Sequence, residues 1–261
     1  MLKYSANIGF MWPDRPLLER IAAAGRAGFR AIEMHWPYDV PAKVIAAACR
    51  DAGVEVVGLN TVRGRPGEFG LGALPGREAD FAASFAQALD YAEVLGAPFI
   101  HAMAGAIDGH DAAAERTLVA NLTAAADQAA AAGVGVLLEA LNPRDNPGYF
   151  YSTVERAAEI IGKVGRPNIK LMFDCYHVGS GQGDILPRLK ALLPVIGHIQ
   201  IAAVPSRAEP DEGEIAYDRV LAAIDALGYA GWIGCEYKPR GNTDDGLVWF
   251  DRLGLSPGLA K

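Results

Sequence analysis

The sequence predicts an α/β protein built as a single closed (β/α)8 barrel of the TIM type, and three observations support this. Eight short apolar segments alternate strictly with eight segments of helical periodicity. The chain has 261 residues, a length at which such barrels form one domain, and no shift in composition or flexible linker divides it. A glycine ends most helical segments, at Gly28, Gly53, Gly96, Gly133, Gly165 and Gly228. We therefore expect one domain over residues 1–261.

A doubly wound open sheet is the alternative arrangement of the same alternating elements. Its dinucleotide-binding form carries a glycine triplet after the first strand. The corresponding turn here reads Gly9-Phe10-Met11-Trp12, which lacks that pattern. The closed barrel is therefore the favoured fold.

The expected strands are short apolar runs, as in a parallel sheet that is covered by helices. The fifth run, Gly135 to Ala140, is wholly apolar until it reaches the carboxylate of Glu139. By this pattern the strands are residues 4–9, 30–34, 54–59, 98–101, 135–140, 169–174, 196–200 and 232–236.

The expected helices combine an apolar stripe with a start or stop signal. Leu17, Ile21 and Ala24 form such a stripe in the first helix, and the segment 152–155 reads as a capping box that opens the fifth. The fourth helix is rich in alanine, the residue with the highest helix propensity. The helices are residues 16–27, 40–52, 77–95, 111–132, 152–164, 184–193, 215–227 and 243–253, and a tail of about 254–261 follows.

One connection, residues 60–76, is a long loop that carries six glycines and prolines between Arg63 and Pro75. Long loops in compact domains are often lids or binding loops. We expect this loop on the active face, where it would set the size of the pocket together with Trp12 and Trp36.

Composition excludes several classes of function. The net charge of −7 argues against nucleic-acid binding, which needs clustered Lys and Arg. No basic segment precedes a long apolar stretch at the N-terminus, and no segment reaches eighteen uninterrupted apolar residues, so we expect no membrane insertion and a cytoplasmic location. The three cysteines, Cys49, Cys175 and Cys235, lack metal-finger spacing and are expected to be reduced packing residues.

Four strand ends carry an oxygen ligand: Glu139, Asp174, Gln200 and Glu236, at spacings of 35, 26 and 36 residues. Barrels of this type place their active sites at the carboxyl ends of the strands. Burying an ionised carboxylate without a partner is costly, so these side chains should face a cation or a polar pocket. Three carboxylates and one amide oxygen suit Mg²⁺ or Mn²⁺, whereas zinc prefers His and Cys.

The chain resembles the hydroxypyruvate isomerase family of xylose-isomerase-like TIM barrels over nearly its whole length. Four segments carry the resemblance: Leu138-Glu139-Ala140-Leu141-Asn142-Pro143, Phe173-Asp174-Cys175-Tyr176-His177, His198-Ile199-Gln200-Ile201-Ala202 and Gly234-Cys235-Glu236-Tyr237. Related sugar epimerases place a histidine at the position of Gln200, so the glutamine favours the isomerase branch.

The resemblance implies a divalent metal ion held by Glu139, Asp174, Gln200 and Glu236, with the two glutamates also exchanging substrate protons. It also implies that His177 and Arg207 approach the substrate. His177 would project from the loop after Asp174 and could donate to a substrate oxygen, and a surface or capping histidine is the alternative. Arg207 could hold a carboxylate in bidentate fashion, and Lys238, Arg240 and Arg63 compete for that role. His101 would either line the pocket or pack behind it.

The activity that this resemblance implies is the interconversion of hydroxypyruvate and 2-hydroxy-3-oxopropanoate (tartronate semialdehyde) by enediolate proton transfer. A 2-oxo-tetronate isomerase or a ketose 3-epimerase on the same barrel is the first alternative. A metal-dependent DNA-repair endonuclease is a remote one, because it would need a histidine cluster for several zinc ions and a basic groove. A non-catalytic binding barrel is also left open, as is assembly into a homo-oligomer. The expected partner is thus a small oxo acid or sugar, with neither nucleic acid nor a membrane.

Overall fold

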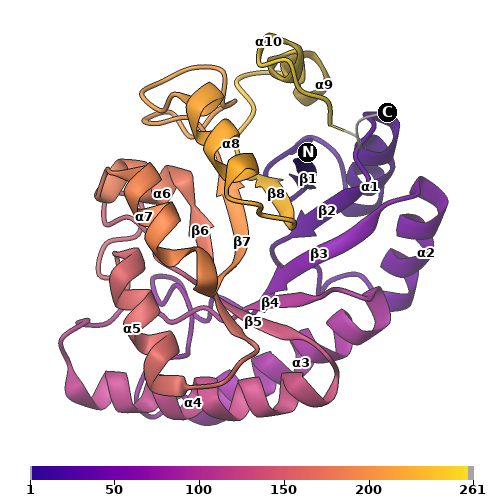
Figure 1. Ribbon diagram of the computed structural model, residues 1–261. Helices are drawn as coiled ribbons and strands as arrows, with labels where there is room; N and C mark the ends of the chain where they lie inside the picture. The colour runs from indigo at the N-terminus through magenta and orange to yellow at the C-terminus, as the bar shows by residue number, and fades with distance from the viewer. Residues whose placement is uncertain (1, 258–261) are drawn as a thin grey trace.

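The computed structural model describes residues 2–257, and over them the chain forms a closed barrel of eight parallel strands (Figure 1). The strands follow one another around the barrel in sequence order, and β1 closes the ring by pairing with β8. The predicted barrel is confirmed. Its strands are β1 Lys3–Asn7, β2 Ala31–Met34, β3 Glu55–Asn60, β4 Phe99–His101, β5 Gly135–Glu139, β6 Ile169–Asp174, β7 Ile196–Ile201 and β8 Trp232–Cys235.

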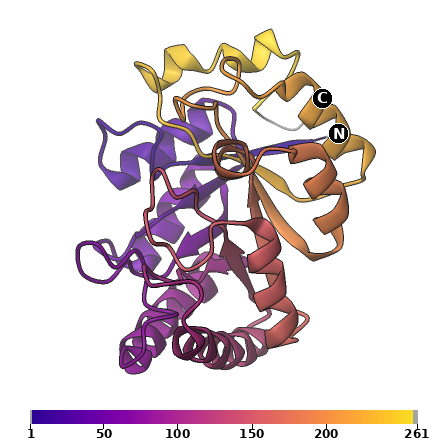
Figure 2. The ribbon, with the colours of Figure 1, turned by 90° about the vertical axis from the view of Figure 1, so that its left-hand side faces the viewer.

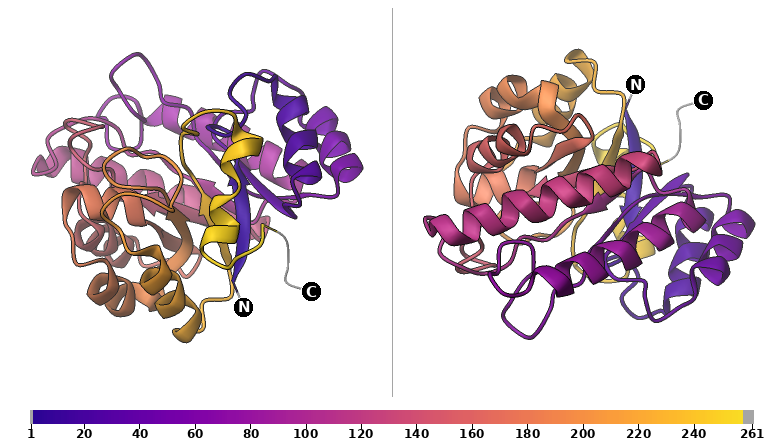
Figure 3. Two further views of the ribbon diagram at one scale, coloured as in Figure 1. Left: turned by 90° about the horizontal axis from the view of Figure 1, so that it is seen from above. Right: turned by 90° about the horizontal axis from the view of Figure 1, so that it is seen from below.

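Helices cover the outside of the barrel, as the turned view and the views from above and below show (Figures 2 and 3). The long helices α3 and α4 pack side by side along one flank. Glycines in the left-handed conformation end α2, α3 and α5, as the sequence predicts. The helices are α1 Leu17–Arg26, α2 Ala42–Ala52, α3 Glu78–Leu95, α4 Ala112–Ala131, α5 Val154–Val164, α6 Cys175–Gly181, α7 Ile185–Leu192, α8 Tyr217–Ala226, α9 Thr243–Gly246 and α10 Trp249–Arg252, with a 3-10 turn, η1, at Leu193–Val195.

The short helix α6 is absent from the sequence prediction, which places a loop directly after β6. The side chain of Asp174 accepts a hydrogen bond from the backbone N–H of Tyr176 at 2.8 Å and so caps the helix. Because the capping residue is also the last residue of the strand, strand and helix meet with no loop between them. His177 therefore lies on a helix and not on a loop.

Two details of the predicted helices are wrong. The segment 243–253 forms two short helices, α9 and α10, and is not one continuous helix. The capping box at 152–155 is also incomplete, since Thr153 caps α5 by accepting from the N–H of Arg156 at 3.2 Å. Glu155 does not reach back to the helix start, because its carboxylate binds Gln182 and Arg188.

The loop predicted over residues 60–76 begins one residue later, because Asn60 still belongs to β3, and residues 61–76 contain no named helix or strand. Its later half is fixed by backbone hydrogen bonds to the segment after β4. Leu71 and Gly72 donate to the carbonyl of Met103, and Ala73 donates to that of Ala104. The loop thus lies over the same end of the barrel as the polar strand ends.

The three cysteines are buried free thiols, and burial raises the pKa of Cys175 well above its ordinary value, which suits a packing role. Among the described helices, none combines the length and apolar character that a membrane span requires.

Candidate active site

The structure places the four polar strand ends at the carboxyl end of the barrel. Glu139 ends β5, Asp174 ends β6, Gln200 lies near the end of β7 and Glu236 directly follows β8. Asp174 pairs with Gln200 in the strand register. Glu139 and Asp174 also approach the same ring nitrogen of His177, at 3.7 and 3.6 Å. All four residues are buried, with at most 5% of each residue's surface exposed.

Three oxygen atoms of this group have no hydrogen-bond donor among the described residues. They are Oε1 of Glu139, Oδ2 of Asp174 and Oε1 of Gln200. A buried acceptor without a partner is costly, so such atoms are rare in folded proteins. Oxygen atoms of carboxylates and amides are the ligands that Mg²⁺ and Mn²⁺ prefer. The donor set therefore fits a hard divalent cation.

The raised pKa values of two of these carboxylates also support a cation site. Burial, together with repulsion from Glu236, raises the pKa of Asp174 to about 7. Burial and the charges of Glu236 and Asp174 raise the pKa of Glu139 well above its ordinary value. A cation between these groups would favour their ionised forms and relieve the repulsion.

Glu236 differs from the other carboxylates because donors already surround it. Burial alone would raise its pKa, but Arg207 and His35 hold it well below its ordinary value. Arg207 donates to Oε2 at 2.6 Å, while Oε1 lies 2.8 Å from Nε2 of His35 and accepts from Asn7 at 3.1 Å. Glu236 is thus held as a carboxylate.

His177 belongs to the group with Glu139 and Asp174 whose ligand atoms lie within 4.8 Å of one another. Its Nδ1 accepts the backbone N–H of Asn142 at 2.9 Å, so the proton of the neutral ring is assigned to Nε2. Burial lowers the pKa of His177 to about 3, which keeps the ring neutral near pH 7. A protonated Nε2 cannot bind a metal, and this atom is instead a hydrogen-bond donor that faces the carboxylates.

Arg207 brings a positive charge into the same site. Its guanidinium stacks against the rings of Phe10 and Tyr176, at 4.9 and 4.8 Å from their centres, and also lies 3.9 Å from Oδ2 of Asp174. The residue takes a left-handed backbone conformation with φ of 56°, which is uncommon outside glycine. The aromatic rings and the backbone together aim this cation at the carboxylates.

The structure distinguishes among the other cationic side chains that could bind a substrate carboxylate. Lys238 lies next to Arg207, since its backbone N–H donates to the Arg207 carbonyl at 2.7 Å and its ammonium is 5.6 Å from the Phe10 ring. Arg63 instead stacks on Trp36 and Phe69. The guanidinium of the fourth candidate, Arg240, is occupied by Glu209, Asp211 and Glu212.

The expectation that Trp12 borders the pocket is wrong. Its side chain is fully buried and donates to Asp244 at 2.7 Å, so it belongs to the core. Trp36 is 39% exposed and donates to the carbonyl of Thr61, at the start of the long loop. His101 lies on the pocket side, with Nδ1 3.5 Å from Oε2 of Glu139, and burial lowers its pKa to about 4.

Sequence reasoning missed Asn7, Glu33 and His35. Asn7 ends β1 and His35 directly follows β2, so both occupy the strand-end positions that identified the other residues. The same signal could have found them. Glu33 gives a weaker signal because it lies inside β2, where its carboxylate hydrogen-bonds Ser5 and Gln200.

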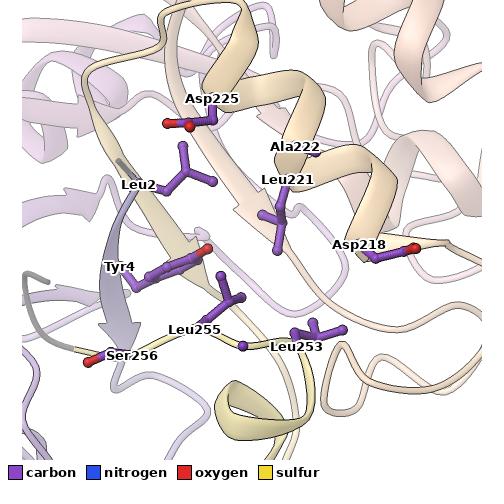
Figure 4. Close-up of a pocket in the computed structure, with 10 residues that line it drawn as sticks. Leu2, Tyr4, Asp218, Leu221, Ala222, Asp225, Leu253, Leu255 and Ser256 are labelled. Carbon is purple, nitrogen blue, oxygen red and sulfur yellow. The ribbon is translucent and has the colours of Figure 1, made fainter.

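A separate cavity of about 470 Å³ lies near the opposite end of the barrel, beside the first residues of β1 (Figure 4). Leu2, Tyr4, Leu221 and Leu255 are among its mostly apolar lining. It contains none of the carboxylates described above, so its size is no guide to the chemistry.

These observations define a TIM-barrel protein whose strand ends form a buried, acidic centre around one arginine. The chain belongs to the family described as "Xylose isomerase-like TIM barrel", which matches residues 21–253.

Two curated relatives cover nearly the whole chain. A 2-oxo-tetronate isomerase from Cupriavidus necator is 46% identical over 254 residues, which cover 96% of this chain and 98% of that protein. A Mus musculus protein named "Putative hydroxypyruvate isomerase" is 43% identical over 268 residues and 97% of each chain.

Solved structures share the fold. A crystal structure described as AP endonuclease, family 2, from Brucella melitensis superposes with a TM-score of 0.94, at 40% identity over 97% of this chain and 99% of that one. A D-allulose 3-epimerase from Methylomonas sp. has a TM-score of 0.78 at 20% identity, over 98% of this chain and 91% of that one. The second likeness shows the fold alone.

Proposed function

We propose that this protein interconverts hydroxypyruvate and 2-hydroxy-3-oxopropanoate by metal-assisted proton transfer through an enediolate. The chain is an enzyme of isomerase type, as its curated relatives are by name. The choice of hydroxypyruvate follows the Mus musculus relative and the resemblance of the four strand-end segments.

The cation of this proposal is Mg²⁺ or Mn²⁺. Glu139, Asp174, Gln200 and Glu236 would hold it, and the three buried oxygens without donors support that assignment. A divalent ion bound there would act as a Lewis acid that stabilises negative charge on the substrate oxygens.

The protein's own residues would bind the substrate and move the proton. Arg207, with Lys238 beside it, would bind the carboxylate of the oxo acid. Nε2 of His177 would donate a hydrogen bond to a substrate oxygen. Glu139 and Glu236, which come from β5 and from the end of β8, would flank the reacting carbons, remove a proton from one and return it to the other.

One observation carries this proposal: buried oxygens of Glu139, Asp174 and Gln200 lack a donor in the described part of the chain, and the site also holds Glu236, a histidine N–H and an arginine. The test uses protein stripped of metal and then supplied with Mg²⁺ or Mn²⁺, assayed against hydroxypyruvate, 2-oxo-tetronate and a series of ketoses. Turnover of hydroxypyruvate that returns only with the ion supports the proposal. Full activity of the stripped protein, or no activity with any ion, contradicts it.

A 2-oxo-tetronate isomerase is the second candidate, because the Cupriavidus necator relative carries that name. The two substrates share the oxo-acid group that Arg207 would bind and differ by one carbon. The ratio of kcat/KM for the two substrates in the same assay decides between them.

The name of the Brucella melitensis structure raises the nuclease alternative, but the site described here does not favour it. Among residues 2–257, the His, Cys, Asp and Glu side chains that lie close enough together to hold a metal ion are Glu139, Asp174 and His177, and this group contains one histidine rather than a histidine cluster. The net charge of −7 also argues against a surface that gathers phosphate backbones.

A further inference from the structure

A hydrogen bond crosses the barrel interior between β2 and β7. The side-chain nitrogen Nε2 of Gln200 donates to Oε2 of Glu33 at 2.8 Å. The second carboxylate oxygen, Oε1, accepts from the hydroxyl of Ser5 at 2.5 Å. Nε2 of His198 lies 3.1 Å from Oε2, although not along the line of a hydrogen bond. Glu33 is 5% exposed, so these contacts are shielded from water.

The absence of a side chain at Gly234 makes room for this contact. Gly234 lies on β8 and pairs with Gln200 in the strand register. A Cβ atom at Gly234 would lie 2.2 Å from Oε1 of Glu33 and 2.8 Å from Cγ of Gln200. Any other residue at this position would push the two side chains apart, so the glycine and the hydrogen bond belong to one arrangement.

The contact also decides which way the Gln200 amide faces. An ionised carboxylate can only accept hydrogen bonds, so the nitrogen of the amide must face Glu33 and its oxygen must face away. That oxygen, Oε1, is buried and has no donor among the described residues. Turning the amide over would set its oxygen against the carboxylate and would break the 2.8 Å bond.

We propose that Glu33 is a positioning residue for the cation site. It fixes the amide of Gln200 so that the oxygen is presented beside Asp174, its neighbour in the register. Glu33 would not touch the cation, and its role rests on the cation site of the proposed function. Partners that orient a metal ligand in this way typically contribute about 10- to 100-fold to metal affinity.

Two substitutions of Glu33 distinguish a positioning role from an effect of its charge alone. Glu33→Asp keeps the charge but shortens the side chain, so the carboxylate no longer reaches Nε2 of Gln200. Glu33→Gln removes the charge but keeps the length and an oxygen that can accept from Nε2. Positioning therefore predicts that Glu33→Asp weakens Mn²⁺ binding by about 10-fold or more and that Glu33→Gln weakens it less. The opposite order would show that charge alone matters and would overturn the proposal.

The measurement is a calorimetric titration of metal-stripped protein with Mn²⁺, repeated in a Gln200→Ala background. If Glu33 acts through Gln200, either substitution of Glu33 should change the Kd by less than about two-fold once Gln200 is gone. A loss as large as in the presence of Gln200 would overturn the proposal. If Glu33→Asp fails to fold, the proposal is tested by the effect of Glu33→Gln on the Kd, measured with Gln200 present and in the Gln200→Ala background.

Glu209→Gln is the matched control, because Glu209 is a buried carboxylate that binds Arg240 away from the site. It should leave Mn²⁺ affinity unchanged, and an equal loss there would overturn the proposal. The cation of the proposed function and the role of Glu33 can be refuted separately. Wild-type protein that binds no divalent ion would refute the cation of the proposed function, whereas tight binding by both wild type and Glu33→Asp would refute only the role of Glu33.

Discussion

At the scale of single residues, the two glutamates of the site are held in different ways. Both oxygens of Glu236 are engaged, by Arg207 on one side and by Asn7 and His35 on the other. Oε1 of Glu139 has no donor within residues 2–257, and the pKa of Glu139 is raised whereas that of Glu236 is lowered. Carboxylates whose surroundings differ in this way are typical of sites in which protons are exchanged.

The first prediction is that Glu139→Gln and Glu236→Gln each lower kcat by about 10²- to 10⁴-fold, the loss typical of a missing general acid or base. The assay is run at saturating metal, because glutamine keeps one ligand oxygen. If raising the metal concentration restores the rate of one variant, that glutamate is only a ligand. Full activity of both metal-saturated variants would rule the assignment out.

The second prediction concerns Asp174, which both faces the site and caps α6. Asp174→Asn should weaken Mg²⁺ or Mn²⁺ binding, because a charged oxygen ligand is lost. Asparagine caps helices about as well as aspartate, so α6 should persist. Calorimetry of the stripped variant measures the affinity, and circular dichroism checks the fold. Unchanged affinity in a folded variant would remove Asp174 from the ligand set.

The third prediction tests the carboxylate-binding role of Arg207. Arg207→Lys keeps the charge but loses the planar, bidentate group that stacks between Phe10 and Tyr176. Loss of one charge-assisted hydrogen bond, about 1.5–3 kcal/mol, corresponds to a rise in KM of about ten-fold or more. Arg240→Lys is the control, since Arg240 is occupied by a separate acidic cluster and should leave KM unchanged. An unchanged KM in Arg207→Lys would assign the carboxylate to another cation.

At the scale of elements, several helices begin at a side chain that accepts from the backbone of their first turn. Asp111 caps α4 and Thr153 caps α5 in this way, and Asn242 caps α9. Such caps stabilise a helix because they satisfy N–H groups that have no partner within it. The capping box predicted over residues 152–155 would make Ser152 the cap of α5, and the structure selects Thr153 instead.

The fourth prediction follows from that selection. Thr153→Ala should lower the free energy of unfolding by about 1 kcal/mol, within a range of about 0.5–2 kcal/mol. Ser152→Ala, one residue earlier, should change it by no more than about 0.5 kcal/mol. Urea denaturation of both variants gives the two values. The reverse ranking would return the cap to Ser152.

At the scale of the whole molecule, the alternation of apolar runs and helical segments predicts the barrel, because each strand pairs with its neighbours in sequence. The strand-end rule likewise finds Glu139, Asp174, Gln200 and Glu236. It does not find Glu33, because the contact with Gln200 joins β2 to β7 across the barrel and depends on the missing side chain of Gly234. No local pattern records such a contact. The sequence prediction also misses α6, because Asp174 both ends β6 and caps this helix.

The fifth prediction concerns the helix α10, which packs on β1. The ring of Phe250 lies 5.2 Å from that of Tyr4 and 3.8 Å from that of Trp249, and all three are buried. Phe250→Ala should therefore lower the free energy of unfolding by about 3–5 kcal/mol, as for other large buried side chains. Val248→Ala is the control, because Val248 is 45% exposed and should cost no more than about 0.5 kcal/mol. Equal losses of unfolding free energy in the two variants would show that Phe250 does not anchor α10.

The pairing of β1 with β8 has a further consequence for how the site comes into being. Glu236 lies just beyond the last strand, yet two of its three donors among the described residues come from the start of the chain: Asn7 ends β1 and His35 directly follows β2. A ribosome must therefore synthesise all eight strands before this carboxylate can meet them. A nascent chain that has made only seven strands lacks the carboxylate altogether, so this arrangement of donors around Glu236 forms only when the last strand joins the first.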